Sequence, residues 1–276
     1  FEAAVKKGKV RSVMCAYNAV NGMFCSENKH LLTDVLRRQW GYEGFVVTDW
    51  GAVKDRIKGL EAGLDLEMPG GGGVQDAAIV KAVQDGILDE AVLDQAVRNI
   101  LKFLSVWEEQ KLDGVSVERS KLSCLSGDLA EECAVLLQND GILPLNEKNK
   151  IVFIGEYAEK PRYQGSGSSH INVPHPVGAC KAATEVPYAR GFDTHSDVPD
   201  EAMMAEAVSL AKEAEIAILF VGQSDAYESE GTDRMTMELP ANQNTLIEAV
   251  AAVQPNTVVV LHGGAAVLLP WADKVR

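Results

Sequence analysis

The chain has 276 residues, of which 46% are apolar and 24% are charged, an ordinary balance for a globular protein of one or two domains. Its 26 basic and 40 acidic side chains give a formal net charge of −14, and such an acidic surface repels nucleic acid and anionic membranes. No apolar run reaches the roughly 18 residues of a membrane span, so we expect no transmembrane helix.

The first hundred residues alternate strand and helix patterns. Strands are predicted at VRSVMCAYN (10–18), at GFVVTDW (44–50) and within LDLEMPGGGG (64–73), where the strand ends in a flexible loop. Helical patterns lie at KHLLTDVLRRQW (29–40), VQDAAIVKAVQDG (74–86) and DEAVLDQAVRNILKFLSVW (89–107), and VKDRIKGLEAG (53–63) is a short helix or a turn. This order predicts parallel, right-handed strand–helix–strand units. A closed (β/α)8 barrel needs about 250 residues, so any barrel here is only its C-terminal part.

The polar stretch EEQKLDGVSVERSK (108–121) is the best linker candidate, and DLAEECAVLLQNDGILPL (128–145) reads as an amphipathic helix ended by an Asn-Asp-Gly turn. A second alternating region follows. Its strands are predicted at 150–158, 216–223 and 256–264, and its helices at 199–215 and 241–254. The strands are almost continuously apolar, which predicts a parallel sheet covered by helices on both faces.

The five cysteines show no metal-ligand spacing, and we expect neither a metal nor another cofactor. Cys15 and Cys25 could pair in an exported protein, but buried free thiols are the favoured interpretation. The sequence leaves the oligomeric state and the compartment open, with the cytoplasm slightly favoured.

Asp49 follows the strand pattern of residues 44–48, where ligands bind in parallel α/β folds. Function and capping of the next helix are about equally favoured by this position alone. Trp50 shifts the balance modestly towards function, because an aromatic ring beside a strand-end carboxylate offers a platform for a sugar. Tryptophan is also common in protein cores.

A second acidic group lies in SDAYESEGTDR (224–234), after another predicted strand. Composition favours a solvated loop in which Asp233 pairs with Arg234. Two strand-end carboxylates are also what a glycosidase needs, one to attack or stabilise the anomeric carbon and one to protonate the leaving oxygen.

The stretch RYQGSGSSHIN (162–172) is glycine-rich, but it lacks the third glycine of a dinucleotide-binding loop and the lysine of a P-loop. A nucleotide-binding protein is therefore a weak alternative. A polar loop that closes over a neighbouring site fits better. His170 and His262 are interpreted as structural.

Six motifs in register carry a resemblance. They are SVMCAYNAVNG, GFVVTDWGA, AGLDLEMPG, AVLLQNDGILPL, GSGSSHIN and SEGTDR…LP. Together they resemble glycoside hydrolase family three, and within it the β-glucosidases. The resemblance implies an α/β fold: the C-terminal part of a (β/α)8 barrel at 1–105, a linker and helix at 106–145, and an (α/β)6 sandwich at 146–276, with barrel and sandwich both incomplete.

The resemblance also implies roles for individual residues. Asp49 matches the family's nucleophile and Glu230 its general acid/base, with Glu228 as the fallback. Trp50, Tyr17 and Met14 match residues that line the sugar site. The implied substrates are small β-glucosides or oligosaccharides, hydrolysed with retention.

Two further alternatives stay open at this stage. The chain could belong to a β-xylosidase or α-L-arabinofuranosidase of the same family, although Trp50 favours a glucosidase. It could also be a non-catalytic sugar-binding relative, against which the two acids speak. The family's earlier barrel strands hold sugar-binding residues that do not precede residue 10 here, so the 276-residue chain alone is expected to be inactive.

Overall fold

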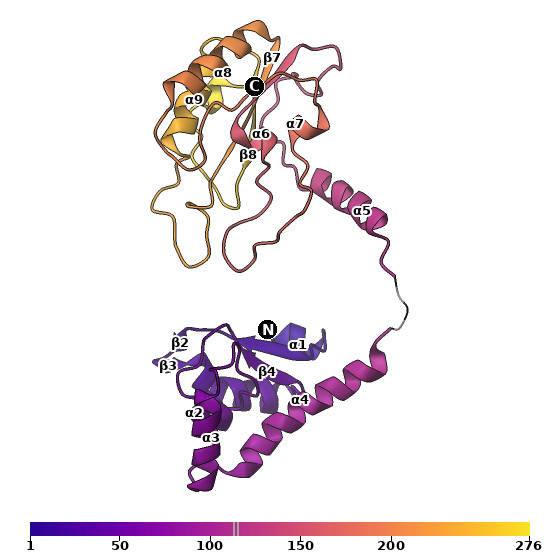
Figure 1. Ribbon diagram of the computed structural model, residues 1–276, viewed down its shortest axis with the longest axis vertical. Helices are drawn as coiled ribbons and strands as arrows, with labels where there is room; N and C mark the ends of the chain where they lie inside the picture. The colour runs from indigo at the N-terminus through magenta and orange to yellow at the C-terminus, as the bar shows by residue number, and fades with distance from the viewer. Residues whose placement is uncertain (113, 115) are drawn as a thin grey trace. The chain divides into compact units, whose positions relative to one another are not determined.

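The computed structural model describes residues 1–112, 114 and 116–276. They form two compact units, Phe1–Leu122 and Ser123–Arg276, which we call unit 1 and unit 2 (Figure 1). Asp113 and Val115, which belong to the predicted linker at 106–145, lie outside the described residues. The finer division at 105 and 145 stays a prediction. In the described part of the chain, no helix is long and apolar enough to cross a bilayer.

Unit 1 alternates short strands with helices, as predicted. In chain order its elements are α1 (Glu2–Lys6), β1 (Ser12–Cys15), β2 (Ala19–Val20), β3 (Met23–Phe24), the 3₁₀ turn η1 (Cys25–Glu27), the π-type helix η2 (His30–Gln39), β4 (Phe45–Thr48), α2 (Arg56–Ala62), α3 (Val74–Gln84) and α4 (Glu90–Gln110). The predicted helix at 29–40 is therefore present, but with wider i→i+5 bonding, as from Trp40 N–H to the Val35 carbonyl (3.0 Å).

β1 and β4 pair in parallel, with Ser12 opposite Phe45 and Cys15 opposite Thr48. The third strand predicted at 64–73 is reduced to a single bridge between Val47 and Leu66. A buried carboxylate interrupts the apolar run there. Asp65 accepts hydrogen bonds from the Val46 N–H (2.7 Å), from Arg37 (2.5 Å) and from Asn99 of α4 (2.8 Å).

Unit 2 is built on one parallel sheet of order β6-β5-β7-β8. Its elements are α5 (Arg119–Glu132, which begins in unit 1), β5 (Ile151–Ile154), α6 (Glu156–Glu159), α7 (Ala179–Ala182), β6 (Tyr188–Ala189), α8 (Glu201–Glu213), β7 (Ile216–Gly222), α9 (Ala241–Ala251), β8 (Thr257–His262) and the 3₁₀ turn η3 (Ala272–Lys274). The three strands and both long helices predicted for this region are present, but residues 156–158, predicted as the end of the first strand, belong to α6. The two-residue strand β6 was not predicted.

Side chains alternate between the two faces of this sheet. On one face, Ile154 and Leu219 belong to a buried cluster that also includes Ala207 of α8 and Leu246 of α9. These two helices lie side by side in Figure 1. On the other face, Phe153 packs in a cluster with Ile218, Ala179 of α7 and Leu145. Both faces are thus buried, which explains the continuous apolar runs of the strands.

The helix predicted at 128–145 is misplaced. α5 covers Arg119–Glu132, and residues 134–139 form neither helix nor strand. Leu122, Leu125 and Leu129 recur at helical spacing, whereas Ala134–Leu137 is a run of consecutive apolar residues without that period. The stretch 134–137 was predicted as helical because it is apolar, although its apolar residues do not recur at helical spacing.

Candidate active site

In unit 1, Asp49 lies directly after β4, at the carboxyl end of the β1–β4 pair. Its backbone N–H donates to the carbonyl of Cys15 (2.9 Å), so the turn that carries it continues from the neighbouring strand. The Asp49 side chain is half-buried, and its Oδ1 accepts the N–H of Trp50 at 2.6 Å. The Asp49 carboxylate is therefore held at the strand end.

The capping interpretation of Asp49 is wrong. The next helix, α2, begins only at Arg56, and its cap is Asp55, whose Oδ1 accepts the N–H groups of Ile57 and Lys58, both at 3.1 Å. Asp49 has no part in that cap. The position remains open for a functional carboxylate.

Three apolar side chains near Asp49 are exposed. Met14 is 59% exposed in β1, Tyr17 is 48% exposed in the loop after it, and Trp50 is 66% exposed. Trp50 is thus not a core residue of unit 1. Aromatic rings exposed beside a carboxylate can stack on a sugar ring, so the exposure of these side chains is compatible with the predicted sugar site.

Cys15 ends β1 immediately beside this turn and is buried. Burial raises the pKa of its thiol, so at neutral pH Cys15 carries no charge next to Asp49. All five cysteines are described and free, so the Cys15–Cys25 pair is not formed. Cys124 and Cys133 are exposed in these units, so the expectation of buried thiols holds only in part.

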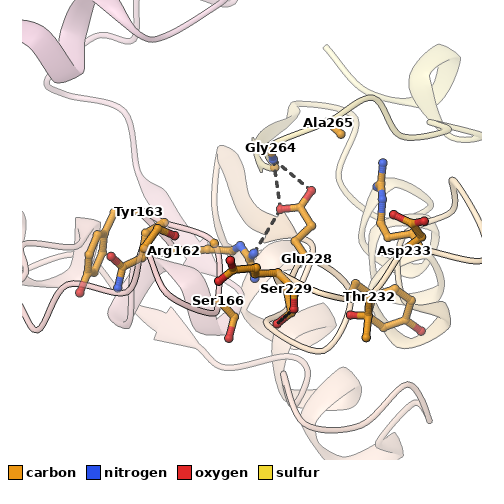
Figure 2. A pocket seen from close by; sticks show the side chains of 16 residues that line it. Arg162, Tyr163, Ser166, Glu228, Ser229, Thr232, Asp233, Gly264 and Ala265 are labelled. Atoms are coloured by element: carbon orange, nitrogen blue, oxygen red, sulfur yellow. Dashed lines mark hydrogen bonds and ion pairs between the residues drawn. The ribbon is translucent and has the colours of Figure 1, made fainter. Parts of the chain in front are cut away.

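Unit 2 contains a cavity of about 610 Å³ at the carboxyl end of its sheet. The loops after β5, β7 and β8 line it, and Figure 2 shows Arg162, Ser166, Glu228 and Gly264 converging from these loops. Both candidate acids of the sequence, Glu228 and Glu230, line this cavity. Their environments differ sharply although they are two residues apart.

The Glu228 side chain is only 14% exposed and is paired with the Arg162 guanidinium at 3.1 Å. Both of its carboxylate oxygens also accept the N–H of Gly264, at 3.1 Å each (Figure 2). Arg162 itself is 7% exposed at its side chain and makes a second pair with Asp225 at 3.2 Å. Glu228 therefore connects three loops, and both of its carboxylate oxygens already have partners within unit 2.

Glu230 is exposed, and its Oε2 accepts the backbone N–H of Ser168 at 2.7 Å. Hydrogen bonds from the side chain and backbone of Ser168 lower the pKa of the Glu230 carboxyl. A general acid needs a raised pKa, so unit 2 by itself does not supply the perturbation that the role demands.

Other residues of these loops have structural roles. Arg234 donates to the carbonyl of Ala266 at 3.1 Å rather than to Asp233. Burial lowers the pKa of His262, whose Nδ1 lies 3.3 Å from the Val221 carbonyl, as expected of a structural histidine. His170 lies 3.0 Å from the Gln164 amide.

The sequence predicted that the loop 162–172 closes over a neighbouring site, but it gave no individual role to Arg162 or Ser168, and none to Gly264. The only signals in the sequence are an arginine at the start of a glycine-serine stretch and a glycine pair after the last strand. The structure thus places Asp49, Trp50, Tyr17 and Met14 around one strand end of unit 1, and Glu230 in unit 2. That the two acids meet at one site stays a prediction. Among the residues described, no group of three or more His, Cys, Asp or Glu side chains is arranged to hold a metal ion.

Comparison with known protein families matches both parts of the chain. Residues 1–103 match the Glycosyl hydrolase family 3 N terminal domain, and residues 134–276 match the Glycosyl hydrolase family 3 C-terminal domain. The chain belongs to glycosyl hydrolase family 3. The resemblance read from the motifs is confirmed, and so is the α/β class with parallel sheets.

Within the family, the chain is 47% identical to thermostable beta-glucosidase B of Acetivibrio thermocellus, over all of this chain and 38% of that protein. It is 40% identical to an exo-alpha-(1->6)-L-arabinopyranosidase of Bifidobacterium breve, again over all of this chain and 38% of the relative. The crystal structure of the GH3 beta-glucosidase of Bifidobacterium adolescentis superposes with a TM-score of 0.90 at 40% identity, over 99% of this chain and 41% of that one. The chain therefore spans about two fifths of the length of these family 3 glycosidases.

Proposed function

We propose that the protein containing this chain is a retaining β-glucosidase that releases β-D-glucose from the non-reducing end of β-glucosides. Asp49 attacks the anomeric carbon, and Glu230 protonates the departing glycosidic oxygen. Water then hydrolyses the glucosyl-enzyme ester, with the Glu230 carboxylate as the base. Unit 1 is the C-terminal part of a (β/α)8 barrel, and unit 2 is part of an (α/β)6 sandwich.

The observation that carries this proposal is the environment of Asp49. It is a strand-end carboxylate of a family 3 chain, has no part in the cap of α2, and lies beside the exposed Trp50. The choice of Glu230 over Glu228 is supported by the contacts of unit 2, because Glu228 is engaged by Arg162 and Gly264 while Glu230 is exposed. Retention further requires the two acids to come within about 5–5.5 Å of each other.

Covalent trapping tests the proposal. The whole protein is incubated with an activated 2-deoxy-2-fluoroglucoside, digested with pepsin, and analysed by mass spectrometry. We expect the fluoroglucosyl group on the peptide that contains Asp49, and no adduct in Asp49→Asn. An adduct on any peptide without Asp49, or inversion at the anomeric carbon by NMR, contradicts the assignment.

A second candidate follows from the identity of 40% with an arabinopyranosidase. In that case the sugar ring is a pentopyranose that lacks the hydroxymethyl group of glucose. Aryl β-D-glucopyranoside and aryl α-L-arabinopyranoside are assayed side by side. A kcat/KM that favours the glucoside by at least about tenfold, a difference of about 1.4 kcal/mol in transition-state binding, supports the glucosidase. The reverse ratio supports the arabinopyranosidase.

A further inference from the structure

The glycine-serine loop Gly165–Ser169 runs directly against the loop that carries Glu230. The Ser166 N–H donates to the Glu228 carbonyl, and the Glu230 N–H donates to the Ser166 carbonyl, both at 3.1 Å. These bonds form a short parallel bridge between Ser166 and Ser229. The backbone around Glu230 is therefore bonded to a loop from a different strand, more than 60 residues away in sequence.

The same loop also reaches the carboxylate. Ser168 N–H binds the Oε2 atom of Glu230 at 2.7 Å. In the part of the chain that the structure describes, no residue other than Ser168 is bonded to this carboxylate, and Glu230 lines the cavity. Glu230 is thus held from one side by the loop and is otherwise accessible to a ligand.

Gly167 permits this approach. Its φ of +103° is a conformation that L side chains rarely adopt, and a Cβ built on it would lie 2.5 Å from the Cβ of Glu230 and 2.9 Å from its Oε2. The Glu230 Cβ is fixed to the backbone and cannot move aside as a side-chain tip could. Any residue larger than glycine at position 167 must therefore displace Glu230 or its loop.

Glu228 connects the loop that carries Glu230 to two neighbouring loops. Its ion pair with Arg162, which begins the loop after α6, and its bonds to Gly264, which follows β8, tie the Glu230 loop on both sides (Figure 2). Arg162 and Glu228 are nearly buried, so removing one partner would leave the other charge unpaired in a place with little water.

We propose that Gly165–Ser169 is a positioning loop for the acid/base Glu230, in which the Ser168 N–H fixes Oε2, Gly167 permits the contact, and Glu228 anchors the arrangement. This inference rests on the proposed function, because the loop can position Glu230 for catalysis only if Glu230 is the acid/base. Holding the carboxylate from one side cuts its loss of rotational freedom in the transition state. Hydrogen bonds from the side chain and the backbone of Ser168 lower the pKa of Glu230, which fits this arrangement, since donors aimed at a carboxylate stabilise its charged form.

The first test compares two alanine variants of the whole protein. Gly167→Ala introduces the clash with Glu230, whereas Gly141→Ala places alanine at the same φ of +103° with no atom within 4 Å of its Cβ. Both carry similar backbone strain, so only the contact with Glu230 differs. kcat/KM is measured on alkyl glucosides, which need protonation of the leaving oxygen, and on activated aryl glucosides, which do not.

We expect Gly167→Ala to lose about a hundredfold more on alkyl than on aryl glucosides, at the lower end of what general acid catalysis contributes. Gly141→Ala should show the same ratio as the wild type. Equal losses of Gly167→Ala on both substrates overturn the inference. So does the same selective loss in Gly141→Ala.

Glu230→Gln separates this inference from the proposed function. If Glu230→Gln shows no selective loss on alkyl glucosides, the assignment of Glu230 as acid fails, and the positioning inference fails with it. If Glu230→Gln shows the selective loss but Gly167→Ala does not, only the positioning inference fails.

Ser168→Pro provides a second test, which can still be carried out if Gly167→Ala does not fold. Proline has no N–H, so the pKa of Glu230 should rise, and the alkaline limb of the kcat/KM profile should move to higher pH. Ser168→Ala keeps the N–H and should shift the limb less. The other titratable or charged groups that line this cavity stay unchanged in both variants: Arg162, Tyr163, Tyr227, Glu228, Asp233 and Arg234. An alkaline limb that does not move in Ser168→Pro contradicts the role of the Ser168 N–H.

Discussion

Unit 1 and unit 2 bury their apolar side chains to different degrees. Unit 2 has four parallel strands with a buried cluster on each face of the sheet. Unit 1 has one parallel pair, and its long helix α4 leaves a stripe of apolar side chains exposed, formed by Val97, Leu101, Leu104 and Trp107. The candidate nucleophile thus belongs to the unit that covers its apolar surface less completely, and the candidate acid/base to the one with a fuller core.

Each unit nevertheless contains a buried carboxylate that connects several elements of its fold. In unit 1, Asp65 links β4 to Arg37 and to α4. In unit 2, Glu156 follows β5 and accepts hydrogen bonds from Arg190 at 2.9 Å and from the Thr194 N–H at 3.1 Å. Such groups stabilise a fold only while they stay charged and paired. The two units therefore differ in how completely they bury apolar side chains, and both contain a buried, paired carboxylate. Substitutions can separate the contributions of the apolar core and of the carboxylate to stability.

The largest effect is expected for Leu246→Ala in the core of unit 2. Leu246 is fully buried in α9 and packs on Gly191 and Ile154. Removing its side chain should cost unit 2 about 2–5 kcal/mol of unfolding free energy, because the sheet and α8 cannot close the cavity. Differential scanning calorimetry of the 276-residue chain measures this as a lowered transition of unit 2. A cost below about 1 kcal/mol would mean that this core is loosely packed.

The next effect is the loss of the Glu156 charge. Burial alone would raise the pKa of Glu156, but hydrogen bonds from Arg190, the Thr194 N–H and Lys160 outweigh it and lower the pKa to about 2. Because the folded pKa lies below the unfolded one, the stabilisation is present above about pH 4.5 and is lost as the pH falls towards 2. A shift of this size corresponds to about 3 kcal/mol at neutral pH.

Glu156→Gln should therefore destabilise unit 2 by about 3 kcal/mol at pH 7, and the gap between variant and wild type should shrink as the pH falls from about 4.5 to 2. Urea unfolding at a series of pH values measures it. Glu206→Gln, at an exposed position of α8, serves as the control and should change stability by less than about 0.5 kcal/mol. A gap that is the same at pH 2 and pH 7 would show that Glu156 acts through packing and not through its charge.

The contrast between the units also shows what the sequence could predict. The strands β5, β7 and β8 carry long apolar runs, and the helices α4, α8 and α9 carry clear periodicity, so their types followed from local pattern. Short or irregular elements did not. β6 has two residues, the strand predicted at 64–73 holds the buried Asp65, and the i→i+5 bonding of η2 leaves no mark on an apolar pattern.

The candidate site, too, could be predicted only in part from the sequence. The place of Asp49 at a strand end could be read from GFVVTDW, but whether it caps a helix depended on where α2 begins. Glu228 and Glu230 are nearly equivalent in sequence. They differ in their partners Arg162, Ser168 and Gly264, which lie 36 or more residues away from the glutamate that each one contacts. A pattern within one loop cannot reveal such partners.

The smallest effect is expected on the exposed stripe of α4. Leu101 is 56% exposed, and lysine has nearly the helix propensity of leucine, so Leu101→Lys should change the stability of unit 1 by less than about 0.5 kcal/mol. It should also reduce self-association of the 276-residue chain, since a charge interrupts a contiguous apolar stripe. Calorimetry and sedimentation velocity measure the two effects.

Leu88→Lys is the contrast. Leu88 is 2% exposed in the cluster between α2, α3 and α4, so lysine there should unfold unit 1. If Leu101→Lys destabilises unit 1 as strongly as Leu88→Lys, then the stripe is covered in solution, and the difference in burial between the two units is smaller than the described residues show.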